Sequence, residues 1–376
     1  SRGLGDVYKR QGWIRSKICK KIWLLEKKFA NDLGIKTTEW KSIKSLEEKL
    51  NLIKIHLKVK LDEIPNLPHV SVPDGESEKD NVIIREWGLK PDFDFQVKTH
   101  QDLVRELKLI DFERGAKISG SGFPLYTGQG AKLERMLINS MINHHIDKYD
   151  FSEIFPPVLI LEESMRTTGQ LPKFKEDMYL SELDNLYLAP TAEVPITNIH
   201  RDEIILDSDL PINYVAYSPC FRRESGSYGK DTRGLHRVHQ FNKVELVKFS
   251  TPEKSYEELE SLTNQAESIL RKLGLHYRVV ELCTGDLSFS AAKCYDLEIW
   301  APTEKKWLEV SSCSNFEDFQ ARRGNIRFRR SDNNKVEFVH TLNGSGLATP
   351  RLLVALLETY QNSDGSVAIP DCLPVS

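Results

Sequence analysis

The sequence predicts an α+β fold built on a mainly antiparallel sheet. Two β-capable runs flank a polar, glycine-containing connection within 221–246, which is the pattern of a long-looped antiparallel hairpin. Farther along, the segments RVVELC, AAKCYDLEIWAP and KWLEVSSCSN are predicted strands that only turns separate. Parallel neighbours would need long crossover connections, usually helices. We therefore expect antiparallel strands, with the helices packed beside them rather than alternating with them.

Length and composition set broad limits on the kind of protein. A chain of 376 residues can hold one large domain and a smaller appendage. It contains no run of about 18 apolar residues, and its N-terminus lacks a secretory-signal layout, so we expect neither a membrane span nor export. The cysteines form no CxxC pair, which favours a reducing cytoplasm over a disulfide framework or a zinc ribbon. They are Cys19, Cys220, Cys283, Cys294, Cys313 and Cys372.

The N-terminal region predicts an arm of two helices. Residues 1–12 show no apolar period, and we interpret them as a fragment boundary or translation artefact rather than a native start. Residues 13–63 carry two helical patterns joined at the turn residues 31–34. The second pattern has a heptad seam, which predicts an antiparallel coiled-coil hairpin. Its apolar positions are Ile43, Leu46, Leu50, Ile53 and Leu57.

The arm is basic while the rest of the chain is acidic. From Arg15 to Lys60 there are 13 Lys and Arg against 5 Asp and Glu, a local charge of +8. The whole chain has a net charge of −3, so the remainder carries −11. A basic appendage on an acidic body is typical of nucleic-acid binding, and a solvated lysine face is the alternative.

The rest of the chain is predicted as a linker followed by the large domain. Pro65, Pro68 and Pro73 interrupt helix formation, and we assign 64–99 to a linker and 100–376 to the large domain. In that domain we expect helices over 130–148, 253–273 and 351–361, and a strand over 151–160 that prolines close.

The hairpin concentrates residues suited to a nucleotide. Arg222 and Arg237, placed on opposite strands, could converge on a polyphosphate because guanidinium groups match phosphate oxygens. Glu224 is predicted on the same face as Arg222, where it could accept from an exocyclic amine, and Phe241 could stack on a base. The alternative is cross-strand salt bridging of these arginines with Glu224 or Glu245. A P-loop is absent and no GxGxxG motif is complete, which argues against the usual nucleotide-binding folds.

The ordered motifs resemble those of the class II aminoacyl-tRNA synthetases. The hairpin FRRE…LHRVHQFNKVE, the stretch FSEIFPPVLI and LNGSGLATPRLLVALLE (342–358) are similar to the three signature motifs of that class. Within the class, four segments and the linker IPNLPHVSVP resemble the seryl-tRNA synthetases. The four segments are TAE at 191–193, the hairpin 220–245, LEVSSCSNFEDFQARR at 308–323 and TLNGSGLA at 341–348. The resemblance covers about residues 64–376.

The resemblance implies a set of residues for each substrate. It assigns serine to Thr191, Ala192, Glu193, Arg222, Glu245 and Ser345. It assigns ATP to Arg222, Arg223, Glu224, Arg237, Phe241, Glu309, Val310, Ser311, Ser312 and Arg351. Arg222 and Arg351 would be the catalytic arginines, and Glu309 and Ser312 would hold Mg²⁺. Two of these assignments have structural alternatives, since Ser345 fits a turn and Glu309 fits a strand carboxylate paired with a neighbour.

The implied reaction needs no side-chain nucleophile. The carboxylate of L-serine attacks the α-phosphorus of ATP in line, and pyrophosphate leaves. Arginines and Mg²⁺ stabilise the negative charge. The terminal ribose of tRNA(Ser) then accepts the seryl group, with the loop 225–236 as the expected contact for the acceptor end. Acidic acceptors for the ammonium and the hydroxyl of serine would penalise alanine and glycine.

The resemblance also implies an assembly and leaves rival hypotheses. It implies a cytoplasmic homodimer through 130–160, around Pro157, and an arm that is shortened here, so we expect adenylate formation with weak or absent tRNA charging. Cysteine spacing offers no ligand pattern, and we expect no zinc. One rival is a carrier-protein ligase, which the basic arm and TAE disfavour. The other is a catalytically silent paralogue, which the retained arginines and glutamates disfavour.

Overall fold

The computed structural model describes residues 43–225 and 234–373. The chain divides into two units: Ser1–Pro65 with His69–Ser71, and Asn66–Pro68 with Val72–Ser376. The described part of the first unit contains the helix α2 (Ile43–Asp62), which ends shortly before Pro65, as predicted. Leu50 on the predicted seam is 49% exposed. The first predicted arm helix, residues 14–29, lies outside the described residues.

The second unit is organised around an eight-stranded sheet in the order β1-β11-β12-β13-β16-β10-β9-β4. All neighbours pair antiparallel except β4 and β9, which are parallel, so the predicted antiparallel α+β architecture is confirmed. The strands are β1 (Val82–Trp87), β4 (Ser152–Ile154), β9 (Ile212–Phe221), β10 (Gln240–Ser250), β11 (Tyr277–Glu281), β12 (Lys293–Ala301), β13 (Lys306–Asn315) and β16 (His340–Ala348).

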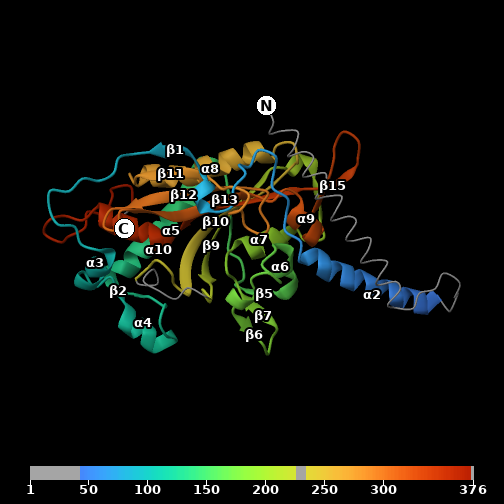
Figure 1. The fold of residues 1–376 in the computed structure, drawn as a ribbon, viewed down its shortest axis with the longest axis horizontal. Coiled ribbons are helices and arrows are strands. Elements are labelled where there is room, and N and C mark those ends of the chain that lie inside the picture. Colours follow the sequence, from blue (N-terminus) through green and yellow to red (C-terminus); the bar gives the residue numbers. More distant parts are fainter. Residues whose placement is uncertain (1–42, 226–233, 374–376) are drawn as a thin grey trace. The chain divides into compact units, whose positions relative to one another are not determined.

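Three helices cover one face of this sheet (Figure 1). They are α5 (Gly128–Tyr149), α8 (Ser255–Lys272) and α10 (Thr349–Thr359). Because side chains alternate along a strand, Val244 and Leu246 of β10 pack into the core that these helices share. Phe241, Lys243 and Glu245 occupy the opposite face, which is therefore available for a site.

Smaller elements complete the unit. The remaining helices are α3 (His100–Glu106), α4 (Phe112–Ser119), α6 (Glu162–Thr167), α7 (Glu193–Thr197), α9 (Phe319–Gly324) and the short 3₁₀ helices Glu78–Asp80, Lys175–Asp177, Asn198–His200 and Asp207–Asp209. The remaining strands are β2 (Ile110–Asp111), β3 (Leu125–Tyr126), β5 (Leu159–Leu161), β6 (Leu180–Ser181), β7 (Leu186–Leu188), β8 (Ile204–Leu206), β14 (Arg327–Arg329) and β15 (Val336–Phe338). They form the sheets β15-β14-β8, β2-β3 and β5-β7-β6. None of the described helices is both long and apolar enough to cross a membrane.

Three sequence predictions need correction. The single strand over 151–160 is two strands in different sheets, β4 and β5, because Pro156 and Pro157 lack the N–H that a ladder needs. The last helix begins at Thr349 rather than Arg351, since Pro350 suits a first helical turn. Part of the segment assigned to the linker, Val82–Trp87, is an edge strand paired with β11.

Candidate active site

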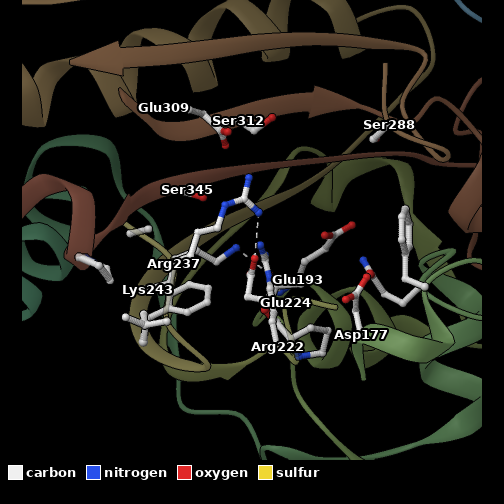
Figure 2. Close-up of a pocket in the computed structure, with 18 of the residues that line it drawn as sticks. Asp177, Glu193, Arg222, Glu224, Arg237, Lys243, Ser288, Glu309, Ser312 and Ser345 are labelled. Atoms are coloured by element: carbon white, nitrogen blue, oxygen red, sulfur yellow. Dashed lines mark hydrogen bonds and ion pairs between the residues drawn. The ribbon is translucent and has the colours of Figure 1, made fainter. Parts of the chain in front are cut away.

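A cavity of about 690 Å³ lies on the sheet face that carries Phe241 and Lys243. Most of the predicted site residues line it, although they are spread along the chain from position 191 to position 351. They are Thr191, Glu193, Arg222, Glu224, Arg237, Phe241, Glu309, Val310, Ser312, Ser345 and Arg351. Figure 2 shows Glu309 and Ser312 on one side of the cavity, and Arg222, Glu224 and Lys243 on the other.

The other predicted residues do not line the cavity. Ala192 is fully buried beside it, and the Ser311 hydroxyl donates to the carbonyl of Ser345 at 2.7 Å. Arg223 is directed elsewhere: its Nε donates to the carbonyl of Met178 at 3.0 Å, and its guanidinium lies 5.0 Å from the Tyr179 ring. Glu245 is also fully buried, beneath side chains that do line the cavity.

A buried polar cluster forms one end of the cavity. Lys243 Nζ donates to Thr191 Oγ1 at 2.8 Å and forms an ion pair with Glu245. The Thr191 hydroxyl donates to Glu245 Oε2 at 2.7 Å, and Asn343 Nδ2 donates to Glu245 Oε1 at 3.2 Å. The charge of Glu245 is thus matched within the protein, as a buried carboxylate requires.

Glu193, the second carboxylate at this end, is held differently. Gln320 Nε2 donates to Glu193 Oε1 at 2.7 Å, and the amide is fixed because its oxygen accepts from the Thr341 hydroxyl at 2.7 Å. Glu193 makes no ion pair within the described part of the chain. Burial, followed by the nearby charge of Glu245, raises the pKa of Glu193 to about 7. The carboxylate is therefore poised to accept a cationic group from a ligand.

Arg222 stands between this cluster and the wider part of the cavity. Its backbone N–H donates to the carbonyl of His239 at 3.0 Å, which fixes the chain just after β9. Its Nε donates to the carbonyl of Pro190 at 3.3 Å, and its guanidinium lies 5.2 Å from the Phe241 ring. Among the described residues no acceptor takes its terminal nitrogens, so they can receive an anion.

The predicted position of the hairpin residues on its strands is wrong. β9 ends at Phe221 and β10 begins at Gln240, so Arg222, Glu224 and Arg237 all lie in the connection. Glu224 has a left-handed φ of 50°, and the expectation that it shares a strand face with Arg222 fails for that reason. The salt-bridge alternative is present as well, since Arg237 Nη1 lies 3.2 Å from Glu224 Oε2. Both residues nevertheless line the cavity.

Arg351 and Glu309 form the opposite wall. Arg351, in the first turn of α10, donates from Nη1 to the carbonyl of Glu309 at 2.9 Å and lies 3.5 Å from its carboxylate. Nε of Arg351 donates to the carbonyl of His236 at 3.3 Å. The structural alternative for Glu309, a strand carboxylate paired with a neighbour, is therefore present in this structure, and the neighbour is Arg351.

An oxygen-rich group lies behind Glu309 on the neighbouring strands. The Ser312 hydroxyl donates to Asp296 Oδ1 at 2.7 Å, across the pairing of β12 and β13. Burial and then the charge of Glu309 raise the pKa of Asp296 to about 8. The carboxyl groups of Asp296 and Glu309 therefore lie near each other and near the Ser312 hydroxyl. A cation bound between these oxygens would offset the repulsion between the two carboxylates.

Sequence reasoning missed four residues of the site. They are Lys243, Asp296, Gln320 and Asn343. For Lys243 a signal existed, because period two places it on the face of Phe241 and Glu245. Asn343 falls within the quoted TLNGSGLA segment. For Asp296 and Gln320 no local pattern points to the cavity, since each acts through a partner that the fold brings near.

The cysteines take no part in a metal-ligand cluster in the described ranges. There, the group of side chains spaced to hold an ion is His100, His236 and Glu304, with ligand atoms within 4.8 Å of one another. His100 Nδ1 already contacts Glu358 Oε1 at 3.2 Å, and His236 Nε2 contacts Glu304. We regard these contacts as structural pairings.

Comparison with known proteins identifies the family. Residues 174–360 match the tRNA synthetase class II core domain (G, H, P, S and T). The serine–tRNA ligase of Geobacillus sp. (strain WCH70) is 59% identical over 331 residues, which cover 88% of this chain and 78% of that protein. The serine–tRNA ligase of Geobacter sulfurreducens is 57% identical over the same shares of the two chains.

Solved structures agree with the sequence comparison. Seryl-tRNA synthetase from Pyrococcus horikoshii, complexed with ATP, superposes with a TM-score of 0.83 at 36% identity, covering 98% of this chain and 90% of that one. Prolyl-tRNA synthetase from Giardia lamblia has a TM-score of 0.64 at 17% identity, which supports the fold alone. With relatives this similar over most of both chains, and with the expected motifs gathered in one cavity, this chain belongs to the seryl-tRNA synthetase family.

Proposed function

We propose that this chain activates L-serine with ATP to form seryl-adenylate and then transfers the seryl group to tRNA(Ser). The observation that carries the proposal is the continuity of one cavity. Thr191 and Glu193, suited to a small ammonium-bearing substrate, open onto the same space as Arg222 and Arg351. A carboxylate nucleophile and a triphosphate can therefore meet within one enclosure.

Each residue has a distinct task in adenylate formation. Glu193 accepts hydrogen bonds from the substrate ammonium and fixes the amino acid. Arg222 binds the substrate carboxylate and an α-phosphate oxygen together, which brings the attacking oxygen into line with phosphorus. Phe241 stacks on the adenine, and Glu224 accepts from its amino group. Arg237 and Arg351 bind the outgoing phosphates and stabilise the charge that builds on them.

The site fits Mg²⁺ as the ion that accompanies ATP. Mg²⁺ prefers oxygen ligands, and Glu309 and Ser312 offer them while Asp296 orients Ser312 through its hydrogen bond. The observation that supports the fit is the oxygen donor set: the Ser312 hydroxyl contacts Asp296, whose pKa is raised first by burial and then by the nearby charge of Glu309. When bound, the ion would neutralise charge on the phosphates. We propose no zinc, since in the described ranges neither the serine-pocket residues nor the cysteines supply a zinc ligand set.

We also propose a cytoplasmic homodimer with a coiled-coil arm for tRNA. The dimer proposal rests on apolar side chains left exposed at the end of the predicted 130–160 interface. Phe155 is 83% exposed, and Leu159 is 52% exposed. An apolar patch of this kind is typical of a protein–protein interface. The basic composition of 13–63 supports phosphate contacts by the arm, and a tRNA substrate places the reaction in the cytoplasm.

Serine-dependent ATP–pyrophosphate exchange tests the proposal. We expect exchange with L-serine and at least about 100-fold less with alanine or glycine, because a site built around a hydroxyl penalises its absence. Charging of tRNA(Ser) transcripts, measured in the same preparation, tests the second step. A folded protein without serine-dependent exchange would overturn the assignment and favour a silent paralogue. Exchange combined with transfer to a phosphopantetheinyl carrier protein instead of tRNA would favour the carrier-protein ligase.

A further inference from the structure

We propose that Lys243 sets the side-chain specificity of the serine pocket by closing its inner end to a second ammonium group. This inference rests on the proposed function and deepens it. Lys243 lines the cavity, whereas Glu245 lies fully buried beneath it. A ligand that enters the pocket therefore meets the lysine ammonium before it meets the Glu245 carboxylate.

The first support is the charge balance at the inner end. The Lys243 and Glu245 side chains are 7% and 0% exposed, and they form an ion pair. Glu245 also accepts hydrogen bonds from Thr191 and Asn343. The inner end thus contains one cation and one anion and has no net charge to offer a ligand. A neutral group such as a hydroxyl can bind there, because Asn343 lines the cavity and keeps hydrogen-bonding capacity beyond its bond to Glu245.

The second support is the contrast with Glu193. Its hydrogen-bond partner is the neutral amide of Gln320, at 2.7 Å, and it has no ion-pair partner among the described residues. The pocket therefore presents one uncompensated carboxylate, which suits one ammonium. Together, the neutral inner end and the Glu193 carboxylate favour an amino acid with a single cationic group and a small neutral polar side chain.

Lys243 is a positioning residue in this account rather than a reacting one. Without its charge, Glu245 would become a second uncompensated carboxylate within the pocket. An amino acid with an ammonium in place of the serine hydroxyl would then be attracted rather than repelled. L-2,3-diaminopropionate has that structure and nearly the size of serine, so it reports directly on the charge of the inner end.

The test compares pyrophosphate exchange with L-serine and with L-2,3-diaminopropionate at neutral pH, at which the side-chain amine of the diamino acid is protonated. We expect the wild-type protein to prefer serine strongly. Lys243→Met should lower the ratio of kcat/KM for serine to that for the diamino acid by at least about 100-fold, because a like-charge repulsion becomes an attraction. Lys243→Gln is the second variant if Lys243→Met fails to fold, with the same direction expected.

Two controls separate charge from structural damage. Lys248→Met removes another buried lysine from β10, one that pairs with Glu258 away from the cavity, and it should leave the ratio unchanged. The double variant Lys243→Met/Glu245→Gln removes both charges, and the gain for the diamino acid should disappear. An unchanged ratio in folded Lys243→Met overturns this proposal. Absence of serine-dependent exchange in the wild type would instead overturn the proposed function.

Discussion

Two ion pairs of one cavity, one in the serine part and one in the ATP part, show how differently these parts are built. Lys243 and Glu245, at the serine end, have side chains that are 7% and 0% exposed. Arg237 and Glu224, at the ATP end, are 46% and 21% exposed, with 3.2 Å between Arg237 Nη1 and Glu224 Oε2. The first pair is surrounded by fixed hydrogen bonds, whereas the second lies on the connection between β9 and β10.

The difference follows from what each end must recognise. A small amino acid offers few contacts, so its selection depends on buried polar groups that lose free energy when a ligand leaves them without a hydrogen-bond partner. A nucleoside triphosphate carries several negative charges, so accessible arginines are sufficient to bind it. In this structure the carboxylates of Glu224 and Glu309 pair with those arginines. Substitutions at the serine end should therefore affect selectivity and stability together, whereas those at the ATP end should affect catalysis with little change in stability.

The largest effect is expected at the residue that serves both ends. Arg222→Gln removes the cation that joins the substrate carboxylate to the α-phosphate, and kcat/KM in pyrophosphate exchange should fall by about 10²- to 10³-fold, the range for a charge-stabilising donor. Arg223→Gln is the matched change, because the Arg223 side chain is directed to Met178 and Tyr179. Equal losses in the two variants would contradict the assignment of Arg222 to both substrates.

The next effect concerns the ammonium acceptor. Glu193→Gln keeps the shape of the side chain and loses its charge, and a charged hydrogen bond is worth about 1.5–3 kcal/mol. The KM for serine should rise by about 10- to 100-fold, while the KM for ATP should change little. Equilibrium unfolding provides the control: the raised pKa of Glu193 lowers stability as pH rises from 4.5 toward about 7. Above that pH the variant should be at least as stable as the wild type.

The same carboxyl group predicts a pH dependence of serine capture. Below its pKa of about 7, Glu193 is protonated and does not attract an ammonium group. The kcat/KM for serine should therefore rise with pH, by about tenfold per unit on the acidic side, and level off above neutrality. Glu193→Gln should flatten this limb. A wild-type profile without an inflection near neutrality would show that another group controls binding.

A smaller effect is expected at Asp296, the residue that orients the proposed magnesium ligand Ser312. Asp296→Asn removes the carboxylate that accepts from Ser312 at 2.7 Å and orients its hydroxyl. Partners of this kind typically change metal affinity by about 10-fold or more, so half-saturation of exchange should need about 10-fold more Mg²⁺. The maximal rate at saturating Mg²⁺ should recover most of its wild-type value. A rate that excess Mg²⁺ does not restore would assign Asp296 a different role.

These residues also show how far sequence alone could go. The antiparallel strands were predictable because local periodicity and turn residues encode them, whereas most of the lining residues were implied by the resemblance of the motifs to a known family. The placement of Arg222 and Glu224 was not, since pairing with neighbouring strands decides where β9 ends. Asp296 and Gln320 were missed because each acts through one contact, to Ser312 or Glu193, made only after folding. Lys243 could have been found from its strand face, although its ion pair with Glu245 could not.

The smallest effect is expected for the contribution of the accessible Arg237–Glu224 ion pair to the free energy of unfolding. A double-mutant cycle of Arg237→Gln and Glu224→Gln, followed by urea unfolding without ATP, should give a coupling below about 1 kcal/mol, the usual range for exposed pairs. The coupling should shrink further in added salt, since screening acts on accessible charges. Removing one partner of the buried pair with Lys243→Met should cost about 3–5 kcal/mol, because it leaves Glu245 uncompensated. A coupling between Arg237 and Glu224 that reached about 3–5 kcal/mol and did not change with salt would show that this pair is as preorganised as the buried pair. The contrast between the two parts of the cavity would then fail.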